Sequence, residues 1–314
     1  MTDGAKIVLY SIPHMGHLMP VLQVAEALCE QQHKVVFACA ANLEGRVRAA
    51  SSKRLQLGLL QNGLSDEYMR TFGPACPAFD ECAGKDTPLL DELVAAAQPK
   101  VIVADFFSTA AFRVAAQRQI PLVIIAAAGS AQFVMDAMGS MMGNALEMGP
   151  ALRTARAVIL NTAPGLDAGI EMPQNFHLTG PLLPRGDGEA TAKLLTREAH
   201  GELLEWLERA RATGRPLCYV TTGSAMALKP AQVRALHAGF AASSCSVLWS
   251  LKVAEQAHLP GQLDAERFHV RAWMPQQACL DAATPLQPPE RSSRSRPLRV
   301  LRLASARAAD RACD

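Results

Sequence analysis

Two histidines stand where an apolar segment near the start of the chain gives way to a helical pattern. Residues 6–10 (Lys-Ile-Val-Leu-Tyr) are typical of a buried strand, and His14, Gly16 and His17 follow within the next seven positions. Apolar residues then recur at helical spacing: Leu18, Val21, Leu22, Ala25, Leu28 and Cys29. We expect His17 in the first helical turn, where unpaired backbone N–H groups disfavour the imidazolium and keep histidine neutral, as a general base requires.

A carboxylate occupies a comparable place after a second apolar segment. Residues 101–104 (Val-Ile-Val-Ala) predict another buried strand, and Asp105 comes at its end. The carboxyl ends of parallel strands form the ligand-binding edge of an open α/β sheet. If the two strands are near neighbours, Asp105 can orient His17 through one ring nitrogen while the other faces a substrate hydroxyl. The alternative is that Asp105 only caps a helix beginning near Ser108.

Composition excludes several classes of function. The chain has 314 residues, 49% hydrophobic and 19% charged, with a net charge of +2, as in a globular protein large enough for two domains. We therefore expect no nucleic-acid partner.

No segment approaches the roughly 20 consecutive apolar residues of a membrane span, and no signal sequence precedes the first strand, so we expect no transmembrane segment and a cytoplasmic location. The scattered cysteines predict buried thiols, with neither a metal site nor a disulfide framework.

Short β-branched segments alternate with helical patterns, which predicts parallel sheets covered on both faces, an α/β fold. The predicted strands after the first are residues 34–38, 100–104, 121–125, 157–160, 217–221, 246–251 and 268–272. No GxGxxG follows any of them, so a dinucleotide dehydrogenase is not expected. A stretch rich in Pro and Gly at 179–188 indicates a domain boundary. We expect one domain over 1–180, a linker and helix over 181–212, and a second domain over 213–283.

Six short motifs occur in the order found in UDP-dependent glycosyltransferases. They are Pro-His-Met-Gly-His-Leu-Met-Pro at 13–20, Val-Ala-Asp-Phe-Phe at 103–107, Ile-Leu-Asn-Thr at 159–162, Leu-Thr-Gly-Pro-Leu at 178–182, Thr-Thr-Gly-Ser at 221–224 and Trp-Met-Pro-Gln at 273–276. The chain resembles glycosyltransferase family 1, most of all its soluble plant-type members, over roughly residues 6–283. The resemblance implies a GT-B fold of two Rossmann-like parallel-sheet domains facing across a cleft, here with the second domain truncated. The first would hold the acceptor and the second the nucleotide sugar.

The resemblance also implies roles on the acceptor side. His17 matches the family's catalytic base and Asp105 its partner, which stabilises the imidazolium after the proton is taken. His14, three residues earlier, is a decoy for this role. We assign Gly16 and Met135 to the acceptor side as well, although the methionine-rich stretch around Met135 is also typical of helix packing.

On the donor side, the resemblance implies UDP-glucose as co-substrate, with no cofactor and no metal. Trp273 matches the residue that stacks on the uracil ring, and Gln276 one that binds the ribose side. Gly223 and Ser224 match a loop that contacts the donor phosphate. The alternative for Trp273 is packing within the core.

The match ends at Ala283. Family members continue with a strand, a His-x-Gly-x-x-Ser segment opening a helix, and later Glu and Asp-Gln residues, and residues 284–314 contain none of these. This tail has seven arginines and no lysine among Pro, Ser and Ala, so we expect it to be disordered. We interpret it as a shifted reading frame, a retained intron or a wrongly assigned exon; the alternative is a natural solvated tail.

The sequence predicts two alternative functions, which belong to different classes of protein. The first is a UDP-sugar-dependent glycosyltransferase that moves a hexose to a hydroxyl of a small lipophilic acceptor with inversion, its activity in doubt because the diphosphate-binding part is missing. The second is a non-catalytic protein whose acceptor domain binds a lipophile or depends on a partner chain. In either case an incomplete second sheet would expose an edge and apolar surface, which predicts self-association.

Overall fold

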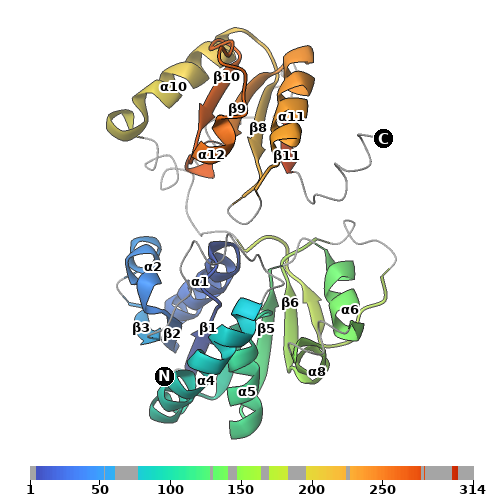
Figure 1. Ribbon diagram of the computed structural model, residues 1–314. Coiled ribbons are helices and arrows are strands. Elements are labelled where there is room, and N and C mark those ends of the chain that lie inside the picture. Colours follow the sequence, from blue (N-terminus) through green and yellow to red (C-terminus); the bar gives the residue numbers. More distant parts are fainter. Residues whose placement is uncertain are drawn as a thin grey trace, which may run out of the picture. The chain divides into compact units, whose positions relative to one another are not determined.

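The computed structural model describes residues 5–52, 54–60, 77–127, 130–140, 147–163, 170–182, 196–223, 227–276, 279 and 299–302. The chain divides into two units, Met1–Arg185 and Gly186–Asp314, each with its own parallel sheet (Figure 1). The division falls within the Pro- and Gly-rich stretch 179–188. The predicted α/β class is confirmed for both units.

The first unit is built on a seven-stranded parallel sheet in the order β3-β2-β1-β4-β5-β6-β7. Its strands are β1 (Lys6–Tyr10), β2 (Lys34–Ala40), β3 (Gln56–Leu60), β4 (Val101–Asp105), β5 (Leu122–Ala126), β6 (Ala157–Leu160) and β7 (Phe176–Leu178). From β1 the chain proceeds outward to β2 and β3, and from β4 it proceeds the other way to β5, β6 and β7. The adjacent strands β1 and β4 therefore mark the point where the strand order reverses, which is where open α/β sheets bind ligands.

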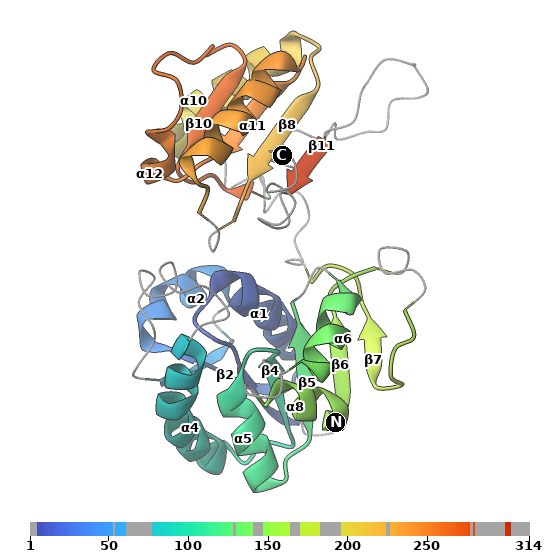
Figure 2. The ribbon, with the colours of Figure 1, turned by 45° about the vertical axis from the view of Figure 1, so that its right-hand side comes forward.

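Helices cover both faces of this sheet (Figure 2). They are α1 (Met15–Glu30), α2 (Glu44–Ala50), α4 (Pro77–Ala97), α5 (Thr109–Arg118), α6 (Ala131–Gly139) and α8 (Met148–Thr154), with a 3-10 turn at Ala41–Leu43. Alternate residues of β1 point to opposite faces. Ile7 and Leu9 pack in the core cluster that contains the apolar stripe of α1, whereas Val8 and Tyr10 pack in the cluster that contains residues of α4 and α5.

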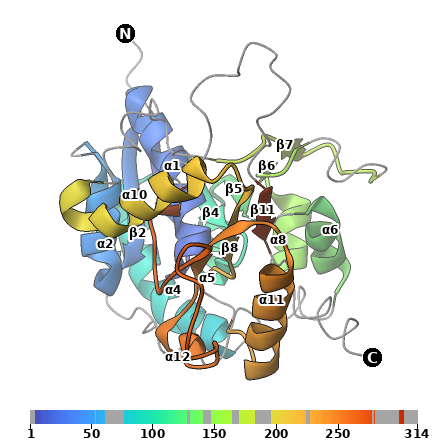
Figure 3. The same cartoon turned by 90° about the horizontal axis from the view of Figure 1, so that it is seen from above.

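The second unit has a four-stranded parallel sheet in the order β10-β9-β8-β11. Its elements are α10 (Arg197–Ala212), β8 (Leu217–Thr221), α11 (Pro230–Ala242), β9 (Ser246–Ser250), α12 (Val253–Gln256), β10 (Phe268–Arg271) and β11 (Arg299–Arg302). Tyr219 and Leu248 pack with α10 in one core cluster, and Val220 and Trp249 pack with α11 in another. The two helices thus lie on opposite faces, as the view in Figure 3 shows.

Strand β11 lies in the segment that we expected to be a disordered tail. It pairs in parallel with β8, from Arg299 opposite Cys218 to Arg302 opposite Thr221. From β8 the chain proceeds outward to β9 and β10, whereas β11 lies on the other side of β8. The strand order therefore reverses between β8 and β11, as it does between β1 and β4 in the first unit. Apart from these four residues, the tail at 284–314 lies outside the described residues. No helix in the described ranges is long and apolar enough to cross a membrane.

Candidate active site

The parallel pairing of β1 with β4 brings His17 and Asp105 to one edge of the first sheet. The register runs from Ile7 opposite Val101 to Tyr10 opposite Ala104, so both strands end at the same level. Asp105 is the last residue of β4, and His17 is the third residue of α1, in the first helical turn as predicted. The sequence placed both residues at a strand end, and the strand order makes these ends adjacent.

The two side chains form a hydrogen-bonded pair. His17 Nδ1 lies 2.8 Å from Asp105 Oδ1, and Asp105 Oδ2 accepts the backbone N–H of Phe107 at 3.0 Å. Asp105 is fully buried and the His17 side chain is 15% exposed. An ionised carboxylate only accepts, so Nδ1 carries the proton and donates it. The lone pair of a neutral His17 is therefore on Nε2, the tautomer that can remove a proton from a hydroxyl group.

Burial and Asp105 have opposite effects on the pKa of His17. Burial of the ring lowers the pKa of His17, but the charge of Asp105 and its hydrogen bond raise it, and the net pKa is above the ordinary value of 6.5. The expected effect of the helix terminus on this imidazole stays a prediction. The contact favours the imidazolium, which is the state that His17 reaches after it accepts a proton.

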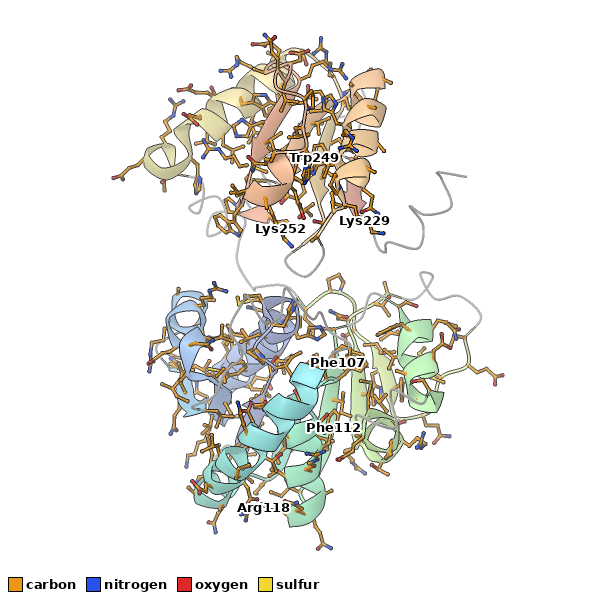
Figure 4. The ribbon with its side chains drawn as sticks, in the orientation of Figure 1. Phe107, Phe112, Arg118, Lys229, Trp249 and Lys252 are labelled. Atoms are coloured by element: carbon orange, nitrogen blue, oxygen red, sulfur yellow. The ribbon has the colours of Figure 1, made fainter. Side chains whose placement is uncertain are left out.

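Aromatic rings surround the imidazole. The Phe107 ring lies edge-on to His17 at a centroid distance of 5.1 Å, and the buried Phe106 lies nearly parallel to His17 at 6.5 Å. The ring of His14 also lies edge-on to His17, at 5.4 Å. Figure 4 shows Phe107 at the end of the sheet where α5 begins, with Phe112 and Arg118 successively farther along that helix. The dyad thus has an apolar wall at the edge of the sheet.

The two weaker acceptor-side assignments lie in different surroundings. A Cβ added to Gly16 would meet the His14 ring at 3.4 Å, so the glycine leaves room for that imidazole beside the dyad. Met135 is partly buried and packs against the core that α4 and α5 share. The same helix, α6, instead exposes Phe133, which the sequence analysis did not single out. Its ring contacts Phe106, and no short-range signal in the sequence marks it.

The donor-side assignments all belong to the second unit. Gly223 follows β8 at the reversal of strand order, has a φ of 71°, and donates its N–H to Thr221 Oγ1 at 3.1 Å. A side chain would strain this left-handed backbone. Ser224 lies outside the described residues. In Figure 4, Lys229 and Lys252, which directly precede α11 and α12, lie toward one end of this unit.

Trp273 and Gln276 follow β10. The neighbouring Met274 is buried in the cluster with α10, but Trp273 is 70% exposed and Gln276 is half-buried. The exposure excludes the alternative that Trp273 is a core residue. Stacking of uracil on this indole and ribose binding by Gln276 remain predictions. Among the described residues, no group of three or more His, Cys, Asp or Glu side chains could hold a metal ion.

Comparison with characterised proteins agrees with the motifs. No family model matches the chain. It is 35% identical over 133 residues to an anthocyanidin 3-O-glucosyltransferase of Hordeum vulgare, covering 40% of this chain and 28% of the relative. It is 35% identical over 166 residues to an enzyme of the same name from Zea mays, covering 48% and 33%. A flavonol 3-O-glucosyltransferase of Arabidopsis thaliana is 32% identical over 135 residues, covering 41% and 29%. The matches thus span about a third of these relatives' length.

Solved structures extend the likeness over most of the chain. A UDP-glucosyltransferase from Polygonum tinctorium, described as capable of glucosylating indoxyl, superposes with a TM-score of 0.67 at 19% identity, covering 88% of this chain and 73% of that one. A UGT transferase from Siraitia grosvenorii, solved with UDP, gives 0.61 at 19% identity, covering 86% and 74%. At this level of identity the likeness shows the fold. The predicted resemblance is confirmed: part of the chain is similar in sequence to plant UDP-glucosyltransferases, and the chain has the GT-B fold of the solved structures.

Proposed function

We propose that this chain is a UDP-sugar-dependent glycosyltransferase that moves a hexose from UDP-glucose to a hydroxyl of a small lipophilic acceptor. The observation that carries the proposal is the His17–Asp105 pair, held at 2.8 Å where the strand order reverses. The similar plant proteins are named for glucosyl transfer to an oxygen of anthocyanidins or flavonols, which supports the reaction type.

In the proposed reaction, Nε2 of His17 removes the proton of the acceptor hydroxyl. The acceptor oxygen attacks the anomeric carbon as the bond from that carbon to the diphosphate oxygen breaks, which inverts the configuration and releases UDP. Asp105 stabilises the imidazolium that results, because its carboxylate already accepts the Nδ1 proton. The rings of Phe106 and Phe107 form an apolar wall beside the base. The reaction needs no metal if polar groups of the second unit stabilise the departing diphosphate.

On the donor side, we propose that Trp273 stacks on the uracil ring and that Gln276 binds the ribose. The exposed indole supports the first role, because a buried one could not be reached by a base. Gly223 and Ser224 are proposed to contact the donor phosphate, and the reversal of strand order at β8 and β11 supports a ligand at that position.

The test is acceptor-dependent release of UDP from UDP-glucose. We expect His17→Ala to lower the rate more than tenfold, since it removes the proton acceptor. His177→Ala is the matched control, because His177 is an exposed histidine on β7 of the same unit. An unchanged rate in His17→Ala would refute the assignment of the base.

A second candidate is a protein that binds a lipophilic acceptor without catalysis. The observation that favours it is the sequence after Ala283. It departs from the family pattern where the hydrogen-bond donors to the departing diphosphate are expected. Loss of one such hydrogen-bond donor lowers the rate roughly 10²–10³-fold in other enzymes. Acceptor binding without any UDP release, in a chain with an intact dyad, would support this candidate over the transferase.

A further inference from the structure

A cavity lies between α5 and α8 in the first unit, at the edge of the sheet opposite to the dyad. Its volume is about 550 Å³, within the roughly 300–1,000 Å³ of small-molecule sites in proteins. Leu122, the first residue of β5, lines the cavity, whereas Asp105 is the last residue of the neighbouring parallel strand β4. In Figure 4, Phe112, which also lines the cavity, lies farther along α5 than Phe107 does. A ligand in this cavity would therefore occupy a site separate from the dyad.

The buried part of the lining is apolar and contains small side chains. Phe112 and Ala115 of α5, Leu122 of β5 and Ala151 of α8 are all buried. Ala116 of α5 also lines the cavity and is exposed at its rim. Because the alanines take little room, the two helices leave a hollow that larger apolar side chains would fill in a close-packed interior. Such a hollow favours the apolar body of a ligand, which leaves water when it binds.

Among the described residues that line the cavity, the only acidic side chain is Glu147, and it is already paired. Arg113 Nε donates to Glu147 Oε1 at 2.8 Å, so the ion pair joins α5 to the residue before α8. The φ of Glu147 is 58°, in the left-handed region. The other described non-glycine residues with positive φ, Gln32, Gln98 and Gln119, come at helix C-termini, where this conformation is common, but Glu147 precedes a helix. Strain of this kind is concentrated at functional sites.

The only cationic side chain in the lining belongs to Arg156, which directly precedes β6. Its backbone N–H donates to Leu122 O at 2.8 Å, which fixes Arg156 beside the start of β5. Its side chain is exposed, and in the described part of the chain the guanidinium has no hydrogen bond or ion pair. The nearby Arg153, which does not line the cavity, instead donates to Met138 O at 2.8 Å. With Glu147 paired, the free guanidinium favours an anion, and its planar donors fit a carboxylate.

We propose that this cavity is a second binding site, which takes a small apolar carboxylate. The apolar body of the ligand lies against the buried lining, and its carboxylate pairs with Arg156. The inference goes beyond the proposed function, because neither the dyad nor the donor side contributes a residue to the cavity. A partly exposed ion pair contributes up to about fivefold in affinity, so the apolar contact supplies most of the binding and Arg156 supplies the selectivity for the charged group.

The test uses two ligands of nearly the same shape: naphthoate and naphthamide, its uncharged analogue. Dissociation constants are measured by calorimetry on the full chain without UDP-sugar. We expect naphthoate to bind at least about threefold more tightly than naphthamide, and Arg156→Gln to abolish this preference while retaining naphthamide affinity. Arg153→Gln is the matched control and should keep the preference. Ala116→Trp places an indole in the hollow and should cause both ligands to lose binding.

The inference is overturned if naphthoate does not bind, if the unmodified chain binds both ligands equally, or if Arg156→Gln or Ala116→Trp leaves their binding unaltered. The substituted positions are exposed, and circular dichroism of each variant verifies that it is folded. Release of UDP reports separately on the proposed function. If UDP release depends on His17 but the ligand preference does not depend on Arg156, the function stands and the inference fails. If the preference depends on Arg156 but no UDP is released, the second site stands and the transferase function fails.

Discussion

The dyad combines a fully buried carboxylate with an imidazole that remains partly accessible. Asp105 accepts two hydrogen bonds, one from His17 Nδ1 and one from the Phe107 backbone N–H, so its burial leaves neither oxygen without a partner. The histidine ring is thereby fixed in one orientation and one tautomer. Because the imidazole is held by its Nδ1 side, its Nε2 side is the one left for a substrate.

Removal of the Asp105 charge should shift the titration of His17. In the unmodified chain the pKa of His17 is above 6.5, because Asp105 outweighs the effect of burial. In Asp105→Asn only burial remains, so we expect the pKa to fall below 6.5 and the neutral form to persist to lower pH. NMR titration of the His17 ring proton, assigned by its loss in His17→Ala, measures both values. Equal midpoints in the two proteins would contradict this account.

The same variant should nevertheless lose activity. An asparagine can accept from Nδ1 but cannot stabilise an imidazolium by its charge, and loss of the corresponding carboxylate in a serine protease costs roughly 10⁴-fold. In any active preparation, the acid limb of the pH profile of kcat/KM should follow the NMR midpoint of each protein.

His17 and Asp105 were predictable from the sequence because each follows a short buried strand. Phe133 was not, because the exposure of one phenylalanine on a helix depends on which face the rest of the fold covers. The sign of the His17 pKa shift also required the structure. It depends on a 2.8 Å contact between residues 88 positions apart, which no local pattern specifies.

At the scale of elements, the prediction found every interior strand of the two described sheets and one edge strand, β10. Segments 157–160 and 217–221 coincide with β6 and β8, and the other predicted strands agree with their observed bounds to within two residues at either end. The strands that were missed, β3, β7 and β11, are all edge strands. Interior parallel strands are covered on both faces and are continuously apolar, whereas edge strands are short or interrupted, as β3 is by Gly58.

A buried polar contact joins β1 to α4. The Tyr10 hydroxyl donates to Asp86 Oδ2 at 2.5 Å, and Asp86 is only 2% exposed, with no partner at Oδ1 among the described residues. Burial raises the pKa of Asp86 above its ordinary 3.8, against the opposing effects of the Tyr10 hydrogen bond and Lys85. The folded state therefore favours the protonated carboxyl group.

This contact predicts a pH dependence of stability. Because the folded-state pKa is raised, the contribution of Asp86 is complete below pH 3.8 and is lost as the pH rises through the folded-state value. Asp86→Asn keeps an acceptor for Tyr10 without a charge, so at neutral pH we expect it to be more stable than the unmodified chain and to unfold at a higher urea concentration. Urea unfolding of both proteins across the acidic range measures the difference. If the free energies of unfolding of the two proteins change with pH in parallel, Asp86 titrates normally in the folded state and this account is wrong.

At the scale of the whole molecule, each described core cluster takes its members from one unit. Two clusters flank the sheet of the first unit, and two flank that of the second. The sequence predicted this division from the composition of 179–188, because a segment without hydrophobic periodicity has no face to bury. A unit with its own core can unfold in its own transition.

Matched core substitutions can show whether the two units unfold separately. Leu22 in α1 is fully buried in the first unit and Leu248 in β9 is 1% exposed in the second, so truncation of either to alanine should cost about 2–5 kcal/mol in its own unit. All three tryptophans, at 206, 249 and 273, belong to the second unit. We therefore expect Leu248→Ala to shift the fluorescence transition and Leu22→Ala to leave it in place while shifting part of the circular-dichroism transition. If both variants shift both signals together, the two units unfold as one cooperative structure.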